Sequence, residues 1–166
     1  MKIGLLSDTH GYLDPRLSEI FVGVDEIWHA GDIGTLETAH QLSLLKPLRA
    51  VTGNIDGHDI RQQYPKFQIF DCEQISVWIT HIGGRPGKYE RNILSMLENG
   101  PPRLFICGHS HILKVMYDRK YDMLYMNPGA AGQSGLHQTR TVLRFVIEET
   151  DIRNLEVIEL GKRGLK

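Results

Sequence analysis

Short apolar runs, each closed by a polar or glycine-containing segment, set the pattern of the first two thirds of the chain. Five such runs occupy residues 2–8, 25–32, 48–54, 75–81 and 103–109. Apolar runs of this length between turn residues are typical of buried strands. We therefore predict a buried strand in each of the five segments.

Helical spacing of apolar residues falls between some of these strands. The pattern predicts three helices, over residues 15–22, 35–45 and 89–98. Asp14 is a candidate N-cap for the first helix, with Pro15 at its first position. The first part of the chain therefore alternates strands with helices.

Beyond residue 110 the pattern changes to strands joined by short turns. Candidate strands occupy residues 112–118, 122–127, 141–149 and 154–160. Two packed β-sheets with helices on their outer faces accommodate both this meander and the earlier alternation. We expect an α/β fold formed by a single domain over residues 1–166, which is long enough for a hydrophobic core.

The composition is that of an ordinary globular protein, with 41% hydrophobic and 23% charged residues. The net charge is −1, so the chain has no overall attraction to nucleic acid or to an anionic membrane. Residues 1–83 hold 6 Lys/Arg and 11 Asp/Glu, and the remainder holds 13 and 9. This split suits a cation site built from the first half and an anionic ligand near the second.

Two further features bear on location. The first apolar run is too short for a signal peptide, and no stretch approaches the ~20 apolar residues of a membrane helix. Cys72 and Cys107 lie in apolar runs without CxxC spacing, which indicates buried free thiols in a reducing compartment. We therefore expect a cytoplasmic protein without a membrane partner.

The side chains at the ends of the predicted strands are all oxygen or imidazole ligands. They are Asp8, His10, Asp32, Asn54, His81, His109 and His111. Taken singly, each has a structural alternative, such as a helix cap, a turn residue or a hydrogen-bonded histidine. Ligands of open α/β sheets bind beyond the carboxyl ends of the strands, where all seven fall. Their recurrence at five strand ends predicts a metal site.

Seven ligands are too many for one tetrahedral ion, and they suit two ions that share a bridging carboxylate, for which Asp32 is the natural choice. The set contains no cysteine, and its oxygen and imidazole groups suit Mn, Fe, Zn or Co. Two such ions ~3.5–4 Å apart activate a water for in-line attack at phosphorus and polarise the phosphoryl oxygens. We predict that Asp32, Asn54 and His109 act in catalysis.

This set of motifs resembles the calcineurin-like metallophosphoesterase superfamily. The motifs are D-x-H at 8–10, G-D at 31–32, G-N at 53–54, His81 and G-H-x-H at 108–111. The short chain, the segment SDTHG at 7–11 and the segment NPGAAG at 127–132 are similar to the small bacterial and archaeal phosphodiesterase branch. The resemblance covers roughly residues 2–132 and implies a four-layer α/β/β/α sandwich of two mixed sheets flanked by helices.

The resemblance also implies how the ligands divide. Asp8, His10 and His111 would hold the first ion, Asn54, His81 and His109 the second, and Asp32 would bridge them. The implied activity is a dinuclear-metal-dependent phosphodiesterase that hydrolyses a small phosphodiester by in-line attack of a metal-activated water. Manganese is the expected metal, and Fe, Zn, Co and Ni remain open.

One position departs from the wider superfamily. Many of its members carry a histidine after the motif asparagine, and that histidine is held to assist the leaving group. Here Ile55 stands in that place, as is common in the small branch, while Asp56 keeps the acidic position and is expected to brace the loop or a nearby histidine. An isoleucine cannot donate a proton, so we expect the metals to carry most of the catalysis.

Basic and histidine side chains in two glycine-rich segments are candidates for substrate contact. They are Arg85, Lys88, His137 and Arg140. A basic side chain suits an anionic ligand, and the alternative for each is a surface loop. His58, just beyond the G-N motif, is read as a solvated loop histidine, with a displaced proton donor as the alternative.

Other functions remain as alternatives. A phosphomonoesterase would favour a strongly basic pocket, which the sequence does not show. A nuclease would favour a long basic and aromatic surface, and aromatic residues are only 8% of the chain, so extended nucleic-acid binding is not expected. Some proteins of this fold are non-catalytic scaffolds in membrane-trafficking assemblies, but the complete ligand set argues against that role. Self-association is left open.

Overall fold

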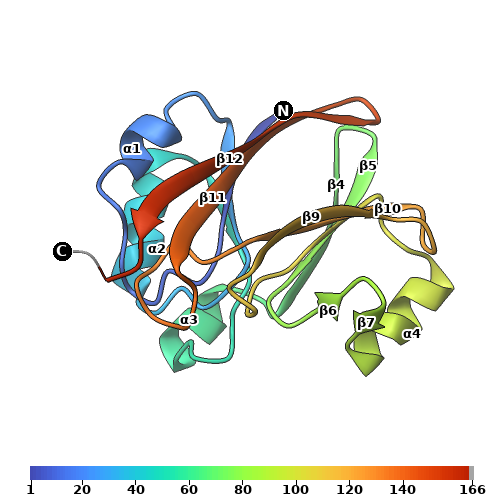
Figure 1. Ribbon diagram of the computed structural model, residues 1–166, viewed down its shortest axis with the longest axis horizontal. Helices are drawn as coiled ribbons and strands as arrows, with labels where there is room; N and C mark the ends of the chain where they lie inside the picture. The colour runs from blue at the N-terminus through green and yellow to red at the C-terminus, as the bar shows by residue number, and fades with distance from the viewer. Residues whose placement is uncertain (165–166) are drawn as a thin grey trace.

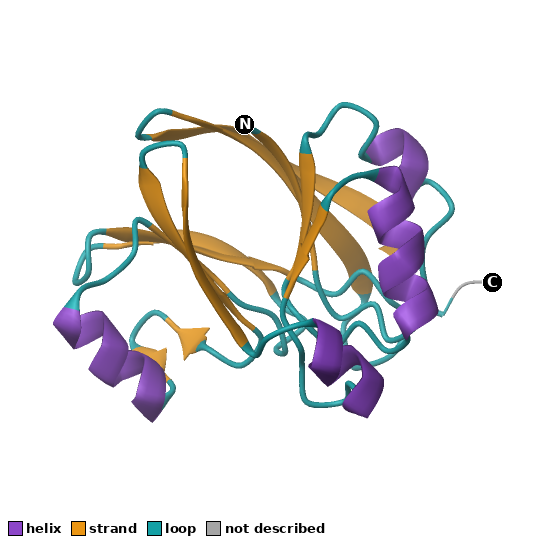
Figure 2. Cartoon of the chain, turned by 180° about the vertical axis from the view of Figure 1, so that it is seen from behind, coloured by secondary structure: helices purple, strands orange, loops and turns teal. Residues whose placement is uncertain are grey.

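The computed structural model describes residues 1–164 as two five-stranded sheets that face each other, with helices on their outer sides (Figures 1 and 2). The first sheet has the strand order β12-β11-β1-β2-β3. Its strands are β1 (Lys2–Leu6), β2 (Glu26–His29), β3 (Leu48–Ala50), β11 (Thr139–Glu148) and β12 (Asp151–Lys162). β1, β2 and β3 run parallel, whereas β11 is antiparallel to both of its neighbours.

The second sheet has the order β4-β5-β8-β10-β9. Its strands are β4 (Phe67–Cys72), β5 (Ile75–Thr80), β8 (Leu104–Ile106), β9 (Leu113–Asp118) and β10 (Met123–Pro128). The three central strands β5, β8 and β10 are parallel, and the two edge strands are antiparallel to them. A separate hairpin is formed by β6 (Gly84–Arg85) and β7 (Lys88–Tyr89).

The helices lie outside the two sheets. They are α1 (Leu17–Ile20), α2 (Leu36–Leu45), α3 (His58–Gln63) and α4 (Arg91–Asn99). Figures 1 and 2 show α1 and α2 against the outer side of the first sheet and α4 beyond the second. The architecture is therefore the four-layer α/β/β/α sandwich of mixed sheets that the resemblance implied.

Apolar clusters fill the three spaces between the layers. The central cluster includes Trp28 from the first sheet and Ile106 from the second. Phe21 belongs to the cluster that also contains residues of α1, α2 and the first sheet. On the other side, Ile93 of α4 packs with Phe105 of the second sheet. Because both faces of the central strands are covered, these strands read as continuous apolar runs.

The first helix is shorter than the predicted 15–22, because α1 contains only Leu17–Ile20. Asp14 does not cap it. Its buried carboxylate instead accepts hydrogen bonds from the guanidinium groups of Arg16, at 2.9 Å, and Arg140, at 3.0 Å. The hydrogen bond from Arg16 lowers the pKa of Asp14 to about 2. Asp14 therefore joins the start of α1 to β11 as part of an ion-pair cluster.

Besides the short hairpin strands β6 and β7, two elements lie where the sequence pattern predicted none. The helix α3 has the sequence HDIRQQ and buries only Ile60, so it lacks the apolar repeat from which a helix is recognised. The edge strand β4 is largely half-buried and carries no clean alternation. The conformations of α3 and β4 are therefore determined by tertiary contacts rather than by a strong local sequence pattern.

The parallel strands bring several loops to one end of the sandwich. β1, β2 and β3 end there, and so do β5 and β8 of the facing sheet (Figure 1). The loops that follow these strands carry the predicted ligands. Within the described part of the chain, no helix is both long and apolar enough to cross a membrane.

Candidate metal centre

The predicted ligands lie in loops just after the strands rather than in the strands themselves. Asp8 and His10 follow β1, Asp32 follows β2, Asn54 follows β3, His81 follows β5, and His109 and His111 follow β8. The loops are joined by backbone hydrogen bonds, among them Asp8 N to Gly31 O and His10 N to Asp32 O, both at 3.0 Å. The ligand loops of the first sheet therefore form one connected surface.

Five of the seven predicted ligands have a left-handed backbone. Their φ angles are 55° for Asp8, 49° for His10, 55° for Asp32, 67° for His109 and 57° for His111. Such angles are uncommon for residues other than glycine, although Asp, Asn and His tolerate them better than most. Unfavourable backbone held by surrounding contacts is characteristic of functional sites. The concentration of these angles at one place marks the loops as the functional end of the molecule.

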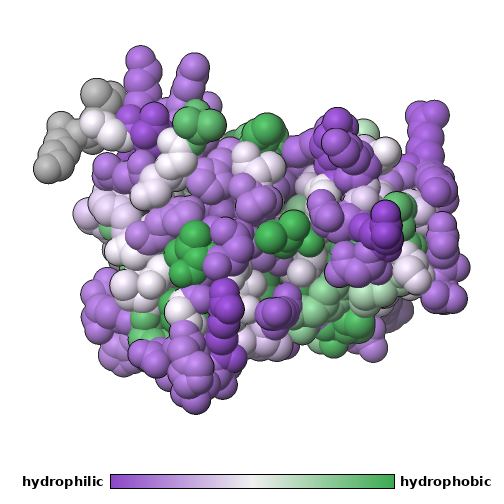
Figure 3. Space-filling model, turned by 90° about the horizontal axis from the view of Figure 1, so that it is seen from below, coloured by the Kyte–Doolittle hydropathy of each residue, from purple (hydrophilic) through white to green (hydrophobic). Residues whose placement is uncertain are grey.

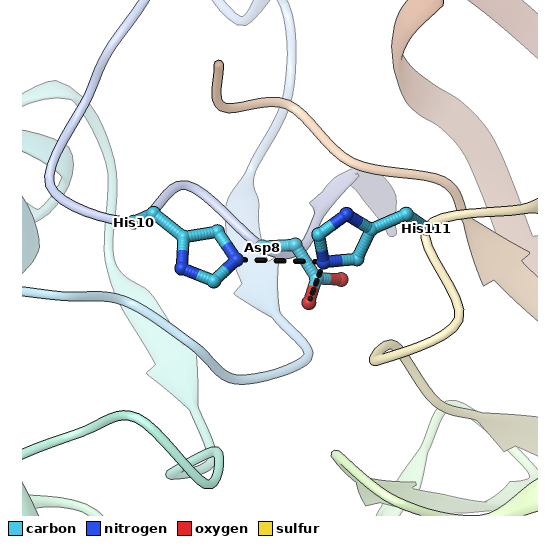
Figure 4. A group of neighbouring side chains, drawn as sticks. All are labelled: Asp8, His10 and His111. Atoms are coloured by element: carbon cyan, nitrogen blue, oxygen red, sulfur yellow. Dashed lines mark hydrogen bonds and ion pairs between the residues drawn. The ribbon is translucent and has the colours of Figure 1, made fainter. Parts of the chain in front are cut away.

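One group of ligand atoms comes from Asp8, His10 and His111, and these atoms lie within 4.8 Å of one another (Figure 4). The Nε2 atoms of the two histidines are 3.4 Å apart, and His111 Nε2 is 3.2 Å from Asp8 Oδ1. Asp8 is fully buried, and its Oδ1 atom has no hydrogen-bond partner among the described residues. Three electron-rich atoms thus point at one small volume.

A second group is formed by Asp32, His81 and His109, whose ligand atoms also lie within 4.8 Å of one another. His81 Nε2 is 3.2 Å from Asp32 Oδ1 and 3.1 Å from Asn54 Oδ1. The other ring nitrogen of His81 contacts the carbonyl oxygen of Ala30 at 2.8 Å, and this contact places the ring proton on Nδ1. In the neutral ring, the Nε2 lone pair of His81 therefore faces the two oxygens.

Asp32 lies between the two groups. Its Oδ1 atom contacts His81, and its Oδ2 atom is 3.8 Å from His10 Nε2. Burial is the largest single influence on both groups, and it raises the pKa of Asp32 and lowers that of His81. The contact between the two side chains outweighs burial only together with other neighbours, among them the Ile55 N–H for Asp32 and the Asp8 carboxylate for His81. The net result is a lowered pKa for Asp32 and a raised pKa for His81. Asp32 is therefore ionised and reaches both groups, as a bridging ligand requires.

The residues present fit two divalent cations. The buried Asp8 Oδ1 atom, which has no donor among the described residues, and imidazole lone pairs that face one another are unfavourable unless a positive charge lies between them. Oxygen and imidazole ligands suit first-row divalent ions, and the thiols of Cys72 and Cys107 are buried free cysteines outside both groups. The donor set therefore matches the predicted metal chemistry.

His137 contacts the ligand His111 from outside the first group. Its Nδ1 atom is 3.2 Å from His111 Nδ1, and its Nε2 atom is 3.1 Å from the carbonyl oxygen of Gly132. The carbonyl can only accept, so it places the His137 proton on Nε2 and leaves Nδ1 as an acceptor. His111 then donates from Nδ1 and keeps its Nε2 lone pair toward Asp8. His137 is thus placed to orient a predicted ligand.

We expect His137→Leu to weaken metal binding at the first group by about 10–100-fold, the usual effect of removing a partner that orients a ligand. His137→Asn should retain much of the affinity, because its side-chain oxygen can accept the same hydrogen bond. Competition between the metal-free protein and a chromophoric chelator measures the affinity. His40→Leu, at an exposed position of α2, is the matched control. Equal affinity in wild type and His137→Leu would contradict the assignment.

Asp56 braces the loops and does not join either ligand group. Its Oδ1 accepts from Gly34 N and its Oδ2 from Gly53 N, both at 2.8 Å. Ile55 donates its backbone N–H to Asp32 Oδ1 at 3.1 Å, while its side chain is half exposed. The backbone of Ile55 thus supports the predicted bridging ligand, although its side chain has no polar group.

Glycine is required where loops approach the carboxylates. A Cβ atom on Gly53 would lie 1.9 Å from Asp32 Oδ1 and 2.3 Å from Asp32 N. A Cβ on Gly108 would lie 2.0 Å from Ser7 Oγ and 2.9 Å from Asp8 Oδ2. The glycines of the G-N and G-H motifs therefore allow neighbouring loops to pack against the ligands.

The predicted substrate residues fall in different places. Arg85 and Lys88 are exposed and line a pocket beside His109. Arg140 is buried, and its guanidinium is held by Asp14 and by the carbonyl oxygen of Leu160. We therefore leave Arg140 out of the substrate pocket. His58 begins α3 with a largely exposed side chain.

Some supporting residues were not identified from the sequence. Arg61 of α3 donates to the carbonyl oxygen of Asn54 at 3.1 Å. Asn127 donates to the carbonyl oxygen of Gly108 at 2.8 Å. Asn127 lies in the segment NPGAAG, which the sequence analysis identified as a motif. The motif did not indicate that Asn127 contacts Gly108. Arg61 gave no signal, because α3 itself was not predicted.

Comparisons with known proteins agree with this geometry. A model of the calcineurin-like phosphoesterase superfamily domain matches residues 1–150. A probable metallophosphoesterase of Methanothermobacter thermautotrophicus is 33% identical over 138 residues, which cover 78% of this chain and 77% of that protein.

Solved structures show the same fold. The structure of an archaeal phosphodiesterase matches with a TM-score of 0.76 and 26% identity, over 96% of this chain and 100% of that one. Vps29 of Entamoeba histolytica, crystallised with zinc, matches with a TM-score of 0.73 and 15% identity, over 96% of this chain and 99% of that one. The second likeness supports the fold alone.

Proposed function

The chain belongs to the calcineurin-like phosphoesterase superfamily, and on this premise we propose that it is a dinuclear-metal-dependent phosphodiesterase. Its reaction is the hydrolysis of a small phosphodiester by in-line attack of water at phosphorus. The observation that carries the proposal is the pair of ligand groups that meet at Asp32. This geometry supports two neighbouring ions sharing one carboxylate.

In this proposal the chain divides its ligands as the resemblance implies. Asp8, His10 and His111 would hold one ion, Asn54, His81 and His109 would hold the other, and Asp32 would be shared between them. Such ions, when bound, lower the pKa of a water and offset charge on the phosphoryl oxygens. The ligand loops hold the donor atoms in place before substrate arrives, so little reorganisation accompanies the reaction.

Asn54 and His109 face the substrate side of the centre. Each of them lines a surface pocket as well as its ligand group. Asn54 is neutral, so it adds an oxygen donor without further negative charge opposite an anionic ester. We assign these two residues and Asp32 to the catalytic machinery.

The test of the proposed function is metal-dependent hydrolysis of bis(p-nitrophenyl) phosphate. We expect chelator-treated protein to be inactive and Mn²⁺ to restore activity, with metal analysis giving two ions per chain. Assays with p-nitrophenyl phosphate in parallel test the phosphomonoesterase alternative, which predicts faster hydrolysis of the monoester. Folded, metal-loaded protein that hydrolyses neither ester would favour the scaffold alternative.

The presence of Ile55 leads to a prediction about how the rate depends on the leaving group. Positioned acid catalysis contributes typically ~10²–10⁴ in rate, and the side chain of Ile55 cannot supply it. We therefore expect the rate to fall steeply across a series of aryl phosphodiesters as the pKa of the leaving phenol rises. Ile55→His should flatten this dependence if the imidazole reaches the leaving oxygen. A wild-type rate independent of leaving-group pKa, with chemistry limiting, would contradict the prediction.

A further inference from the structure

A pocket of about 420 Å³ lies beside the second ligand group, with His109 in its wall. The hairpin β6–β7 forms one side, and residues of β9 and β10 contribute to another. Small-molecule sites in proteins usually enclose ~300–1,000 Å³. The pocket is therefore large enough for one arm of an ester whose phosphorus lies at the ligand groups.

Three cations line this pocket. Arg85 and Lys88 come from the hairpin, and Lys114 comes from β9, against a single carboxylate from Glu90. Within residues 1–164, none of the three cations makes an ion pair, whereas Arg140 and Arg144 are paired. The pocket thus concentrates positive charge that the protein does not neutralise.

The hairpin holds two of these charges together against their repulsion. Arg85 and Lys88 are direct cross-strand partners, and like charges in that position destabilise a pair of strands. Packing fixes the hairpin from outside. Tyr89 donates to the carboxylate of Asp118 at 2.7 Å, and Tyr125 donates to the carbonyl oxygen of Gly84 at 2.8 Å. An anion in the pocket would offset the repulsion.

Apolar side chains complete the lining. Ile82 is 40% exposed and Ile112 is 66% exposed, and each directly follows a predicted ligand. The face that lies below the sheets in Figure 1 is shown in Figure 3, where hydrophobic residues lie among hydrophilic ones. An apolar ring can therefore contact the wall while an anionic group reaches the cations.

We propose that this pocket binds a second phosphate, carried on one ester arm of the substrate. This inference rests on the proposed phosphodiesterase function and names its substrate class. The class is a phosphodiester of a ring-bearing alcohol, such as a nucleoside, with a further phosphate on the same arm. The reacting phosphate lies at the ligand groups, the ring lies against Ile82 and Ile112, and the second phosphate meets Arg85, Lys88 and Lys114.

The test compares two chromogenic esters that differ by one phosphate. They are the p-nitrophenyl ester of thymidine 5′-phosphate and the same ester with an added 3′-phosphate. We expect the 3′-phosphate to lower KM about tenfold, as charge-assisted hydrogen bonds to a bound phosphate would. In Arg85→Ala/Lys88→Ala the two esters should have equal KM. Arg119→Ala, in the turn at the far end of β9, should keep the tenfold difference.

A binding measurement separates this inference from the proposed function. Calorimetric titration of the purified protein should show tighter binding of thymidine 3′,5′-bisphosphate than of thymidine 5′-phosphate, with the difference lost in the double variant. Equal affinities in wild type would overturn the inference even if both esters were hydrolysed. A binding difference without hydrolysis of either ester would overturn the proposed function alone.

A single charge reversal excludes a merely structural role for the hairpin. Lys88→Glu places opposite charges across the two strands, so the melting temperature should not fall. The lower KM of the 3′-phosphorylated ester should nevertheless be lost, and its persistence would overturn the inference.

A dinucleotide 5′-p-nitrophenyl ester identifies the source of the phosphate. A still lower KM points to an oligonucleotide, and an unchanged KM points to a small bisphosphate.

Discussion

Asp32→Asn is expected to leave the protein folded and to lower phosphodiester hydrolysis by more than about 10²-fold, which exceeds the usual effect of losing a residue that only orients a ligand. The variant replaces one carboxylate oxygen of the bridging position with an amide nitrogen and removes its charge. Asparagine tolerates the left-handed backbone that Asp32 adopts, at φ 55°. The loop should therefore keep its conformation while the bridge is lost.

Asp122→Asn is the matched control, because Asp122 also has a positive φ, at 52°, but lies in the turn between β9 and β10. This control should retain full activity and metal content. Asp32→Ala adds a backbone penalty to the loss of the ligand, so it should also unfold at a lower temperature. Full activity with two bound ions in Asp32→Asn would contradict the assignment of Asp32 as the bridge.

Gly53→Ala should cost about 1–3 kcal/mol of stability, the usual effect of forcing extra atoms into a packed region, and should also disturb metal binding. The added Cβ would stand 1.9 Å from Asp32 Oδ1, so Asp32 or the loop carrying Asn54 must shift. A shift of either one separates ligands that need to meet at the second group. Chemical denaturation and metal analysis measure the two effects.

Gly57→Ala is the matched control for this substitution. A Cβ on Gly57 meets nothing within 4 Å, and its φ of −73° suits any residue. Alanine is less favourable than glycine at an N-cap, but it also restricts the unfolded chain, so any loss of stability should be smaller than that of Gly53→Ala and metal content should be unchanged. Equal stability and metal content in Gly53→Ala and Gly57→Ala would contradict the prediction that the close approach of the two loops requires glycine at position 53.

The gathering of the predicted ligands at one end of the sandwich could be predicted from the sequence because their pattern is local. Asp8, Asp32 and His81 each follow an apolar run, and the carboxyl ends of parallel strands meet at one edge. The four-layer sandwich followed from the resemblance that these motifs carry. The four later strands were predicted correctly as strands, but the predicted meander was wrong. β9 and β10 form a hairpin at the edge of the second sheet, whereas β11 and β12 form a hairpin at the edge of the first.

Other features depend on contacts that no local pattern encodes. Arg140 lies in a glycine-rich polar segment that reads as a pocket edge, yet Asp14, 126 residues away in the chain, draws its guanidinium into the interior. Lys114 belongs to a strand whose residues are only partly buried, so nothing in its neighbourhood indicated a pocket. The orienting role inferred for His137 depends on its contact with His111, which the sequence does not indicate. Long-range pairing thus decides which polar residues serve the site.

The left-handed backbone at five ligand positions also constrains how a chain of this fold can lose its metals over evolutionary time. A replacement at residue 8, 10, 32, 109 or 111 spares the fold only if the new residue accepts a positive φ. Glycine and asparagine do so most readily. Drift in a chain released from catalysis should therefore favour these two residues at the former ligand positions. A descendant that kept the sandwich and lost its ions would carry that signature in its sequence.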